Sequence, residues 1–250
     1  MWNRAQLKQS AKNVLQRNYW MAFLVSLVAG LLSGSSGSAG GASGGSGSSF
    51  AEQAVSGGQI DLITASVFTL IVILAAAAAM LLGLTFAFFI SGPVQIGKSR
   101  YYLESREQKS SFGRLFFTFS HSYMNSAAAM FVTNLFIGLW SLLFIIPGIV
   151  KGLAWSQVPY LLAENPGMTG KRARELSDRM TYGHKWDIFV LQLSFLGWIL
   201  LGCLACGVGT LFVTPYVEAT SAELYATLRG NALTNGWATP EELPGMNCNA

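Results

Sequence analysis

The stretch "IIPGIVKGLAWSQVPYLLAENP", from Ile145 to Pro166, decides how the chain is folded. It continues an apolar run that begins near Ala127, and the combined length exceeds the about 20 residues that a helix needs to cross a bilayer. Pro147 cannot continue a helical hydrogen-bond ladder, and Gly148 allows the chain to turn. We therefore predict two helices with a corner at Pro147–Gly148.

The composition is typical of a membrane protein. Apolar residues make up 52% of the 250 residues and charged residues only 11%, whereas soluble domains usually carry about 25% charged residues. The sequence predicts an all-α fold, a polytopic transmembrane bundle of about six helices arranged as three hairpins with cytoplasmic amphipathic helices. It holds no recognisable nucleic-acid motif, phosphate loop or metal-ligand spacing, so we expect no cofactor, no metal site and no nucleic-acid partner.

The basic residues fix the expected topology. Six apolar segments are candidates for crossings, namely 19–32, 62–90, 127–146, 149–163, 188–206 and 208–226. Six crossings put fifteen of the sixteen Lys and Arg residues on one side, and basic residues accumulate on the cytoplasmic side. We therefore expect a multi-pass protein of the plasma membrane with both termini cytoplasmic. A re-entrant hairpin at Pro147 gives the same sidedness and remains an alternative.

Residues 1–229 are predicted to form a single integral membrane domain. An external Gly/Ser-rich loop spans 33–61, and a flexible cytoplasmic tail spans 230–250. The first apolar segment imitates a signal peptide, but its long basic lead-in is patterned like an amphipathic helix. Cys203 and Cys206 form a C-x-x-C pair without a second pair or a nearby His, which favours helix packing over redox or metal chemistry.

A short pattern recurs in the even-numbered apolar segments: a proline is followed four residues later by a small residue. The pairs are Pro93 and Gly97, Pro159 and Ala163, and Pro215 and Ala219. A membrane proline frees a carbonyl that a neighbour must satisfy, and a small residue lets another helix approach closely. The pattern favours three kinked helices that meet at the centre over a substrate path lined by the kinks.

Glu218 is the main candidate for chemistry, because ionisable groups inside a membrane are costly and often functional. It would act as a proton carrier or cation ligand, but a position near the cytoplasm, where Glu218 reaches interfacial water, is the favoured interpretation. Asn134, Gln157 and Gln192 are uncharged and are expected to hydrogen-bond between helices. We assign them a packing role.

The run "TGKRARELSDRM" predicts an amphipathic cytoplasmic helix. Its candidate contacts with anionic lipid headgroups are Lys171, Arg172 and Arg174, and its apolar face is formed by Ala173, Leu176 and Met180. His184 and Trp186 follow at the expected membrane interface, where Trp is enriched.

Four stretches together resemble the bacterial integral membrane proteins of the domain-of-unknown-function 975 family. They are "MWNRAQLKQSAKNVLQRNYWMAFLVSLV", "LLFIIPGIVKGLAWSQVPYLLAENP", "GHKWDIFVLQLSFLGWILLG" and "TPYVEATSAELYATLR". The arrangement more distantly resembles the membrane domain attached to some glycerophosphodiester phosphodiesterases, which implies lipid surroundings. It does not imply hydrolysis, because the soluble catalytic barrel has no counterpart here. The family carries no established activity, so no catalytic residue follows from the resemblance.

Two functions are therefore expected. The first is a non-enzymatic membrane protein that scaffolds partners or organises lipid, with membrane lipids as its partners. The alternative is a small transporter or channel that uses the proline-bearing helices and Glu218. A membrane enzyme is the weakest reading, because no cluster of His, Asp and Glu points to a common site.

Overall fold

The chain is helical throughout the part that the computed structural model describes, which is residues 4–33, 62–107, 112–120, 123–204 and 208–245. These residues form helices and turns and no strand, which confirms the all-α prediction. Three helices are long and apolar enough to cross a membrane, at Ser66–Gly83, Tyr123–Leu143 and Lys185–Gly202. A shorter apolar stretch, Tyr19–Ala29, lies in the first helix. The six predicted crossings are thus matched in part.

One group of helices consists of α1 (Arg4–Ser33), α10 (Lys185–Leu204) and α11 (Val208–Thr234). The basic lead-in and the first apolar segment are one continuous helix, α1, which packs along α11. Helix α10 packs on α11 as predicted for a hairpin. The N-terminal part of α1 also contacts α10, because Lys8 Nζ donates to Ser194 Oγ at 2.8 Å.

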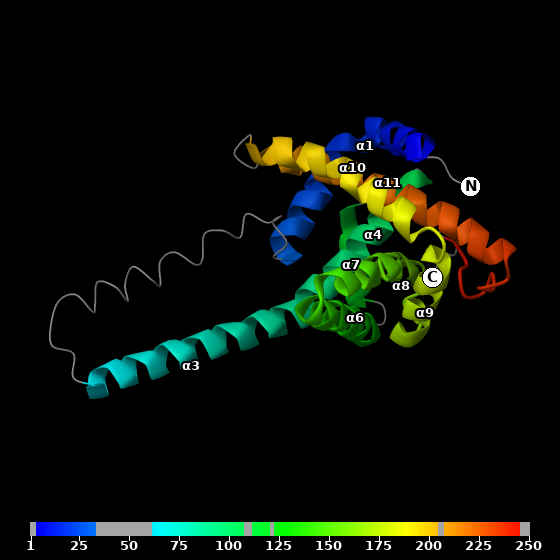
Figure 1. Ribbon diagram of the computed structural model, residues 1–250. Coiled ribbons are helices and arrows are strands. Elements are labelled where there is room, and N and C mark those ends of the chain that lie inside the picture. Colours follow the sequence, from blue (N-terminus) through cyan, green and yellow to red (C-terminus); the bar gives the residue numbers. More distant parts are fainter. Residues whose placement is uncertain (1–3, 34–61, 108–111, 121–122, 205–207, 246–250) are drawn as a thin grey trace.

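The second apolar segment forms α3 (Leu62–Phe86), which continues through a π-helical turn, η1 (Ala87–Ser91), into α4 (Gly92–Arg106). Helix α3 projects away from the other helices (Figure 1), and none of its apolar window is buried. The predicted first hairpin is therefore not formed, since α1 packs against α11 and α4 instead of α3.

Helix α4 lies at the centre, between the α1/α10/α11 group and a second group, α6 to α9 (Figure 1). Its Gly97 lies against η2 (Phe112–Phe116), where a Cβ would clash with the backbone oxygen of Leu115. This contact confirms that a small residue one turn after Pro93 permits close packing, although the partner is η2. The short α5 (Phe117–Ser120) follows.

The chain turns between two helices near the start of the opening stretch, as predicted, but the corner lies before Pro147–Gly148. Helix α6 (Tyr123–Leu143) ends before Phe144, whose extended backbone (φ −149°, ψ 129°) makes the turn, and α7 (Ile145–Ala154) begins at once. Pro147 lies in the first turn of α7, where a helix needs no backbone N–H from it. Gly148 serves close packing: a Cβ there would lie 2.6 Å from Ser141 Cα.

The returning leg is broken, which the sequence analysis did not predict. Helix α7 ends at Ala154, residues 155–157 form a turn, and α8 (Val158–Glu164) carries Pro159 in its first turn. The leg nevertheless comes back to the start of α6, because Asn125 Nδ2 donates to the carbonyls of Pro166 and Met168, both at 2.9 Å.

Helix α9 (Gly170–Thr181) packs against this break. Its predicted apolar face is confirmed, since Ala173, Leu176 and Met180 are buried. The same face carries Ser177, whose hydroxyl donates to the Ala154 carbonyl at 2.6 Å and accepts from the Gln157 N–H at 3.3 Å. Thr181 also donates to the Ala154 carbonyl, at 3.3 Å. Helix α9 thus satisfies the backbone groups that the break leaves open.

Residues 230–245 do not form the flexible tail that the sequence analysis predicted. Helix α11 continues to Thr234, and the following chain packs back with Leu243 buried. Glu242 forms an ion pair with Arg172 at 3.0 Å. The apolar and charged anchors of this segment explain why it packs; residues 246–250 lie outside the described part.

Candidate functional site

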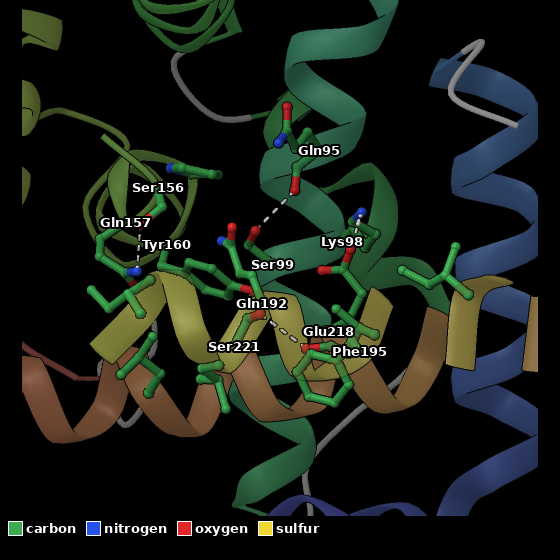
Figure 2. A pocket seen from close by; sticks show the side chains of 16 residues that line it. Gln95, Lys98, Ser99, Ser156, Gln157, Tyr160, Gln192, Phe195, Glu218 and Ser221 are labelled. Atoms are coloured by element: carbon green, nitrogen blue, oxygen red, sulfur yellow. Dashed lines mark hydrogen bonds and ion pairs between the residues drawn. The ribbon is translucent and has the colours of Figure 1, made fainter. Parts of the chain in front are cut away.

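A pocket of about 350 Å³, lined by both polar and apolar side chains, lies between α4, α8, α10 and α11 (Figure 2). The three proline-bearing helices α4, α8 and α11 all contribute to its wall, so they do meet, as the repeated pattern predicted. The polar residues that line it are Gln95, Lys98, Ser99, Ser156, Gln157, Tyr160, Gln192, Glu218 and Ser221. Apolar side chains from α10, among them Phe195, close one side.

Glu218 does not reach into the pocket as an isolated carboxylate. Its Oε1 accepts a hydrogen bond from Lys98 Nζ at 2.7 Å, and the two side chains are 21% and 18% exposed. Lys98 lies on α4 and Glu218 on α11, so the ion pair joins two of the proline-bearing helices. Glu218 is therefore a paired carboxylate beside a cavity, and its position near the membrane interface stays a prediction.

The break between α7 and α8 positions a second polar group. Gln157 is only 2% exposed, and its backbone N–H is held by Ser177 of α9. Its side-chain Nε2 donates to Ser156 Oγ at 2.8 Å, while its Oε1 has no hydrogen-bond partner in the described structure. A buried amide oxygen without a partner costs about 1–3 kcal/mol, and Gln157 is one of the residues that line the pocket.

Four hydroxyl-bearing residues line the pocket, and two of them, Ser99 and Tyr160, are buried. Ser99 and Tyr160 are 2% and 4% exposed. Ser99 donates to the carbonyl of Gln95 one turn earlier, at 3.1 Å, as Figure 2 shows. The pocket thus combines a cation, an anion, an amide oxygen and hydroxyl groups within one small volume.

The three prolines have different roles. Pro159 lines the pocket, whereas Pro93 and Pro215 do not. Pro93 crowds the carbonyl of Phe89, four residues earlier, and that carbonyl accepts from the Tyr123 hydroxyl at 2.6 Å. This contact confirms the prediction that a neighbouring helix satisfies the freed group.

Pro215 lies inside α11. The carbonyl of Phe212, three residues earlier, accepts a hydrogen bond from the Tyr19 hydroxyl at 3.3 Å. The small residues that follow the second and third prolines, Ala163 and Ala219, are both buried, at 0% and 3%.

The predicted lipid-binding cations of α9 are partly occupied by protein contacts. Lys171 is exposed, Arg174 Nη1 donates to Thr133 Oγ1 at 3.4 Å, and Arg172 donates to Glu242. The hydrogen bonds from Arg172 hold the pKa of Glu242 below its usual 4.5, and Glu242 in turn raises the pKa of Arg172. Arg172 is therefore an anchor for the C-terminal segment.

His184 and Trp186 lie outside the pocket. The His184 imidazole lies 3.9 Å from Asp187, and Trp186 is 72% exposed and packs on Phe189. Asn134 is exposed on α6, and among the described residues it does not form the interhelical bond expected of it. Gln192 lines the pocket rather than serving packing alone.

Sequence reasoning missed Lys98, which was counted only as one of a basic cluster. It also missed the buried cluster around Glu164, which accepts from Tyr225, from Arg229 Nε at 2.7 Å and from the Gly245 N–H at 2.7 Å. One signal for Lys98 was available in the sequence. Lys98 directly follows Gly97, where the proline pattern predicted a close approach of another helix. Within the described ranges, no three His, Cys, Asp or Glu side chains lie close enough to hold a metal ion.

A family model described as "Protein of unknown function (DUF975)" matches residues 60–232. The match covers more than half of the chain, so the chain belongs to this family. No curated protein and no solved structure matches. The more distant resemblance to the membrane domain of glycerophosphodiester phosphodiesterases is not shown by these comparisons.

Proposed function

We propose that the chain is a non-enzymatic, multi-pass membrane protein that binds a small, net-neutral polar solute in the pocket between α4, α8, α10 and α11. The observation that carries this proposal is the coincidence of the Lys98–Glu218 pair and the unpartnered Gln157 oxygen in one cavity. Movement of that solute across the membrane is the activity that this site would serve.

The charges of the pocket favour a solute without net charge. Lys98 and Glu218 cancel each other, so a bound ion would leave one uncompensated charge in a partly buried site, which is costly. A zwitterion would present one charge to each of them. A neighbouring N–H or O–H of the solute would donate to Gln157 Oε1, and the volume of about 350 Å³ falls within the range of small-ligand sites, about 300–1,000 Å³.

The same proposal includes six crossings with both termini cytoplasmic in the plasma membrane. Besides the three long apolar helices, these would be the Tyr19–Ala29 part of α1, the broken α7–α8 leg and the first half of α11. The return of residues 166–168 to Asn125 supports this topology, because it brings the chain back to the level where α6 began. The basic residues before α6 and after α8 then share one side, as the distribution of Lys and Arg requires.

Thermal unfolding of the purified full-length protein tests solute binding. Zwitterionic amino acids are compared with acetate and methylammonium, which carry only one of the two charges. A bound zwitterion at 100 times its dissociation constant should stabilise the native state by about 2.7 kcal/mol. Glu218→Gln and Lys98→Met should abolish this stabilisation, and uptake of the same compound into proteoliposomes should fall with it.

Glu223→Gln is the matched control. Glu223 accepts from Arg106 at 2.7 Å between the same two helices, but it lies outside the pocket. Stabilisation that survives in Glu218→Gln, or that is lost equally in Glu223→Gln, would count against a ligand at the Lys98–Glu218 pair.

A scaffolding or lipid-organising protein is the second candidate. It is favoured by α3, whose apolar window has no residue buried within the chain and which therefore offers its whole circumference to lipid or to partner helices. Pull-down with native lipids followed by mass spectrometry tests it. A scaffold should keep the same partners in the Glu218→Gln variant.

A further inference from the structure

We infer that the groove between α1, α10 and α11 binds one anionic phospholipid, with its phosphate at Lys8 and Lys12 and an acyl chain along Trp198 and Phe212. The groove has a volume of about 690 Å³ and is lined by Lys8, Lys12, Leu15, Tyr19, Trp198, Phe212, Val213 and Tyr216. The inference rests on the membrane location within the proposed function and is independent of the solute pocket.

The polarity of the groove follows the order of groups in a phospholipid. Its two lysines lie at one end, in the basic lead-in of α1, and its aromatic residues extend toward the apolar part. The groove follows α1 over about 16 Å, from Lys8 to Tyr19, and α10 and α11 line its other sides. Trp198 and Phe212 are 59% and 47% exposed and therefore offer apolar surface to a chain.

The charges at the polar end are not compensated by carboxylates. Lys8 Nζ donates to Ser194 Oγ and lies 4.7 Å from the centre of the Phe195 ring, which positions the ammonium without neutralising it. Lys12 is exposed and has no ion pair among the residues that the structure describes. None of the described residues that line the groove is acidic.

Among the described residues, Lys151, Lys171, Arg174 and Arg179 share with Lys8 and Lys12 the lack of an ion pair with a carboxylate, whereas other cations are paired. Carboxylates pair with Arg4, Lys98, Arg100, Arg106, Arg172, Lys185 and Arg229. A groove that joins two cations without carboxylate partners to exposed aromatic surface fits an anionic amphiphile. It suits a helix of a second copy less well, because that helix would have to supply acidic residues at the lysine end.

Native mass spectrometry of the full-length protein in detergent micelles tests the inference. Palmitoyl-oleoyl phosphatidylglycerol and the corresponding phosphatidylcholine are titrated separately, and the retained lipid molecules are counted. The variant with Lys8→Gln and Lys12→Gln should bind phosphatidylglycerol about 30-fold more weakly, because each lysine contributes about 1 kcal/mol. Its binding of phosphatidylcholine should not change. Conservative Lys8→Arg and Lys12→Arg substitutions should retain phosphatidylglycerol.

Lys151→Gln with Arg179→Gln is the matched control, since it removes two cations that do not line the groove. An equal loss of phosphatidylglycerol in this control, or no loss in the Lys8 and Lys12 variant, would overturn the inference. So would a lipid-free dimer that dissociates when Trp198 is replaced by alanine. Loss of solute binding in Glu218→Gln, by contrast, leaves the lipid result unaffected.

Discussion

Replacement of Ser177 by alanine tests how α9 holds the broken leg between α7 and α8. The Ser177 side chain is completely buried and forms two hydrogen bonds with backbone groups at the break. Among the described residues, alanine removes the only acceptor of the Gln157 N–H and one of two side-chain donors to the Ala154 carbonyl. The volume of the side chain changes little, so the substitution isolates the hydrogen bonds.

The expected loss follows from these two bonds. An unsatisfied buried N–H costs about 1–3 kcal/mol, and a lost hydrogen bond contributes a further 0.5–1.5 kcal/mol or so. We expect Ser177→Ala to lower the free energy of unfolding by about 2–4 kcal/mol, or on the order of 5–15 °C in melting temperature. Thr181→Ala alone should cost less than 1 kcal/mol or so, because Ser177 still donates to the Ala154 carbonyl.

Intrinsic fluorescence during heating of the detergent-purified protein measures both effects. Ser141→Ala is the control, since the exposed Ser141 hydroxyl donates only to Ile137 of its own helix, at 2.8 Å, and surface changes of this kind are usually within about 0.5 kcal/mol. The double variant of Ser177 and Thr181 should lose more than the sum of the single losses, because it strands the Ala154 carbonyl. Equal melting temperatures for Ser177→Ala and Ser141→Ala would refute this account. So would a double variant whose loss of stability equals the sum of the two single losses.

Three further predictions concern packing and charge. Gly97→Ala should destabilise the protein by about 1–3 kcal/mol, because the added Cβ clashes with η2. Gly138→Ala should be neutral or slightly stabilising, because a Cβ there meets no atom within 4 Å. Thermal unfolding of both variants measures the difference. Because Arg172 lowers the pKa of Glu242, the pair should stabilise the fold above pH 4.5 and lose this effect as the pH falls through the lowered value. The melting difference between wild type and Glu242→Gln should therefore be present at pH 6 and vanish in acid. Leu243→Ala should release the C-terminal segment, so that limited proteolysis cuts after residue 234 at a higher rate than in wild type.

The helical class and the return of the chain after α6 could be predicted from the sequence. Both follow from the length of the apolar segments and the distribution of basic residues, which need no knowledge of tertiary contacts. It also predicted that the proline-bearing helices meet, since a small residue four positions after each proline marks a close approach. The exact position of the corner could not be predicted from the sequence. Phe144 turns the chain through its extended backbone, whereas Pro147 occupies the first turn of α7, a position that proline tolerates as well as a corner.

The candidate site was less accessible from sequence for a physical reason. Glu218 was singled out from the sequence as the main candidate residue, but its partner Lys98 is 120 residues away and only the packing of α4 on α11 brings them together. The C-terminal segment was misjudged in the same way, because its polar composition hides the anchors Glu242 and Leu243. Each becomes visible as an anchor only when α9 and α11 are in place.

The location of the pocket follows from the break in the returning leg. A continuous helix from Ile145 to Glu164 would satisfy its own backbone groups and would need no polar neighbour. Pro159 makes that ladder incomplete, so the chain turns at 155–157 and α9 supplies Ser177 to the open backbone. The turn leaves the Gln157 amide buried beside Lys98 and Glu218. The proline that interrupts the helix therefore also creates the polar wall on which solute binding would depend. Ser177 variants should change the stability of the fold, and Glu218 variants should change the response to the ligand.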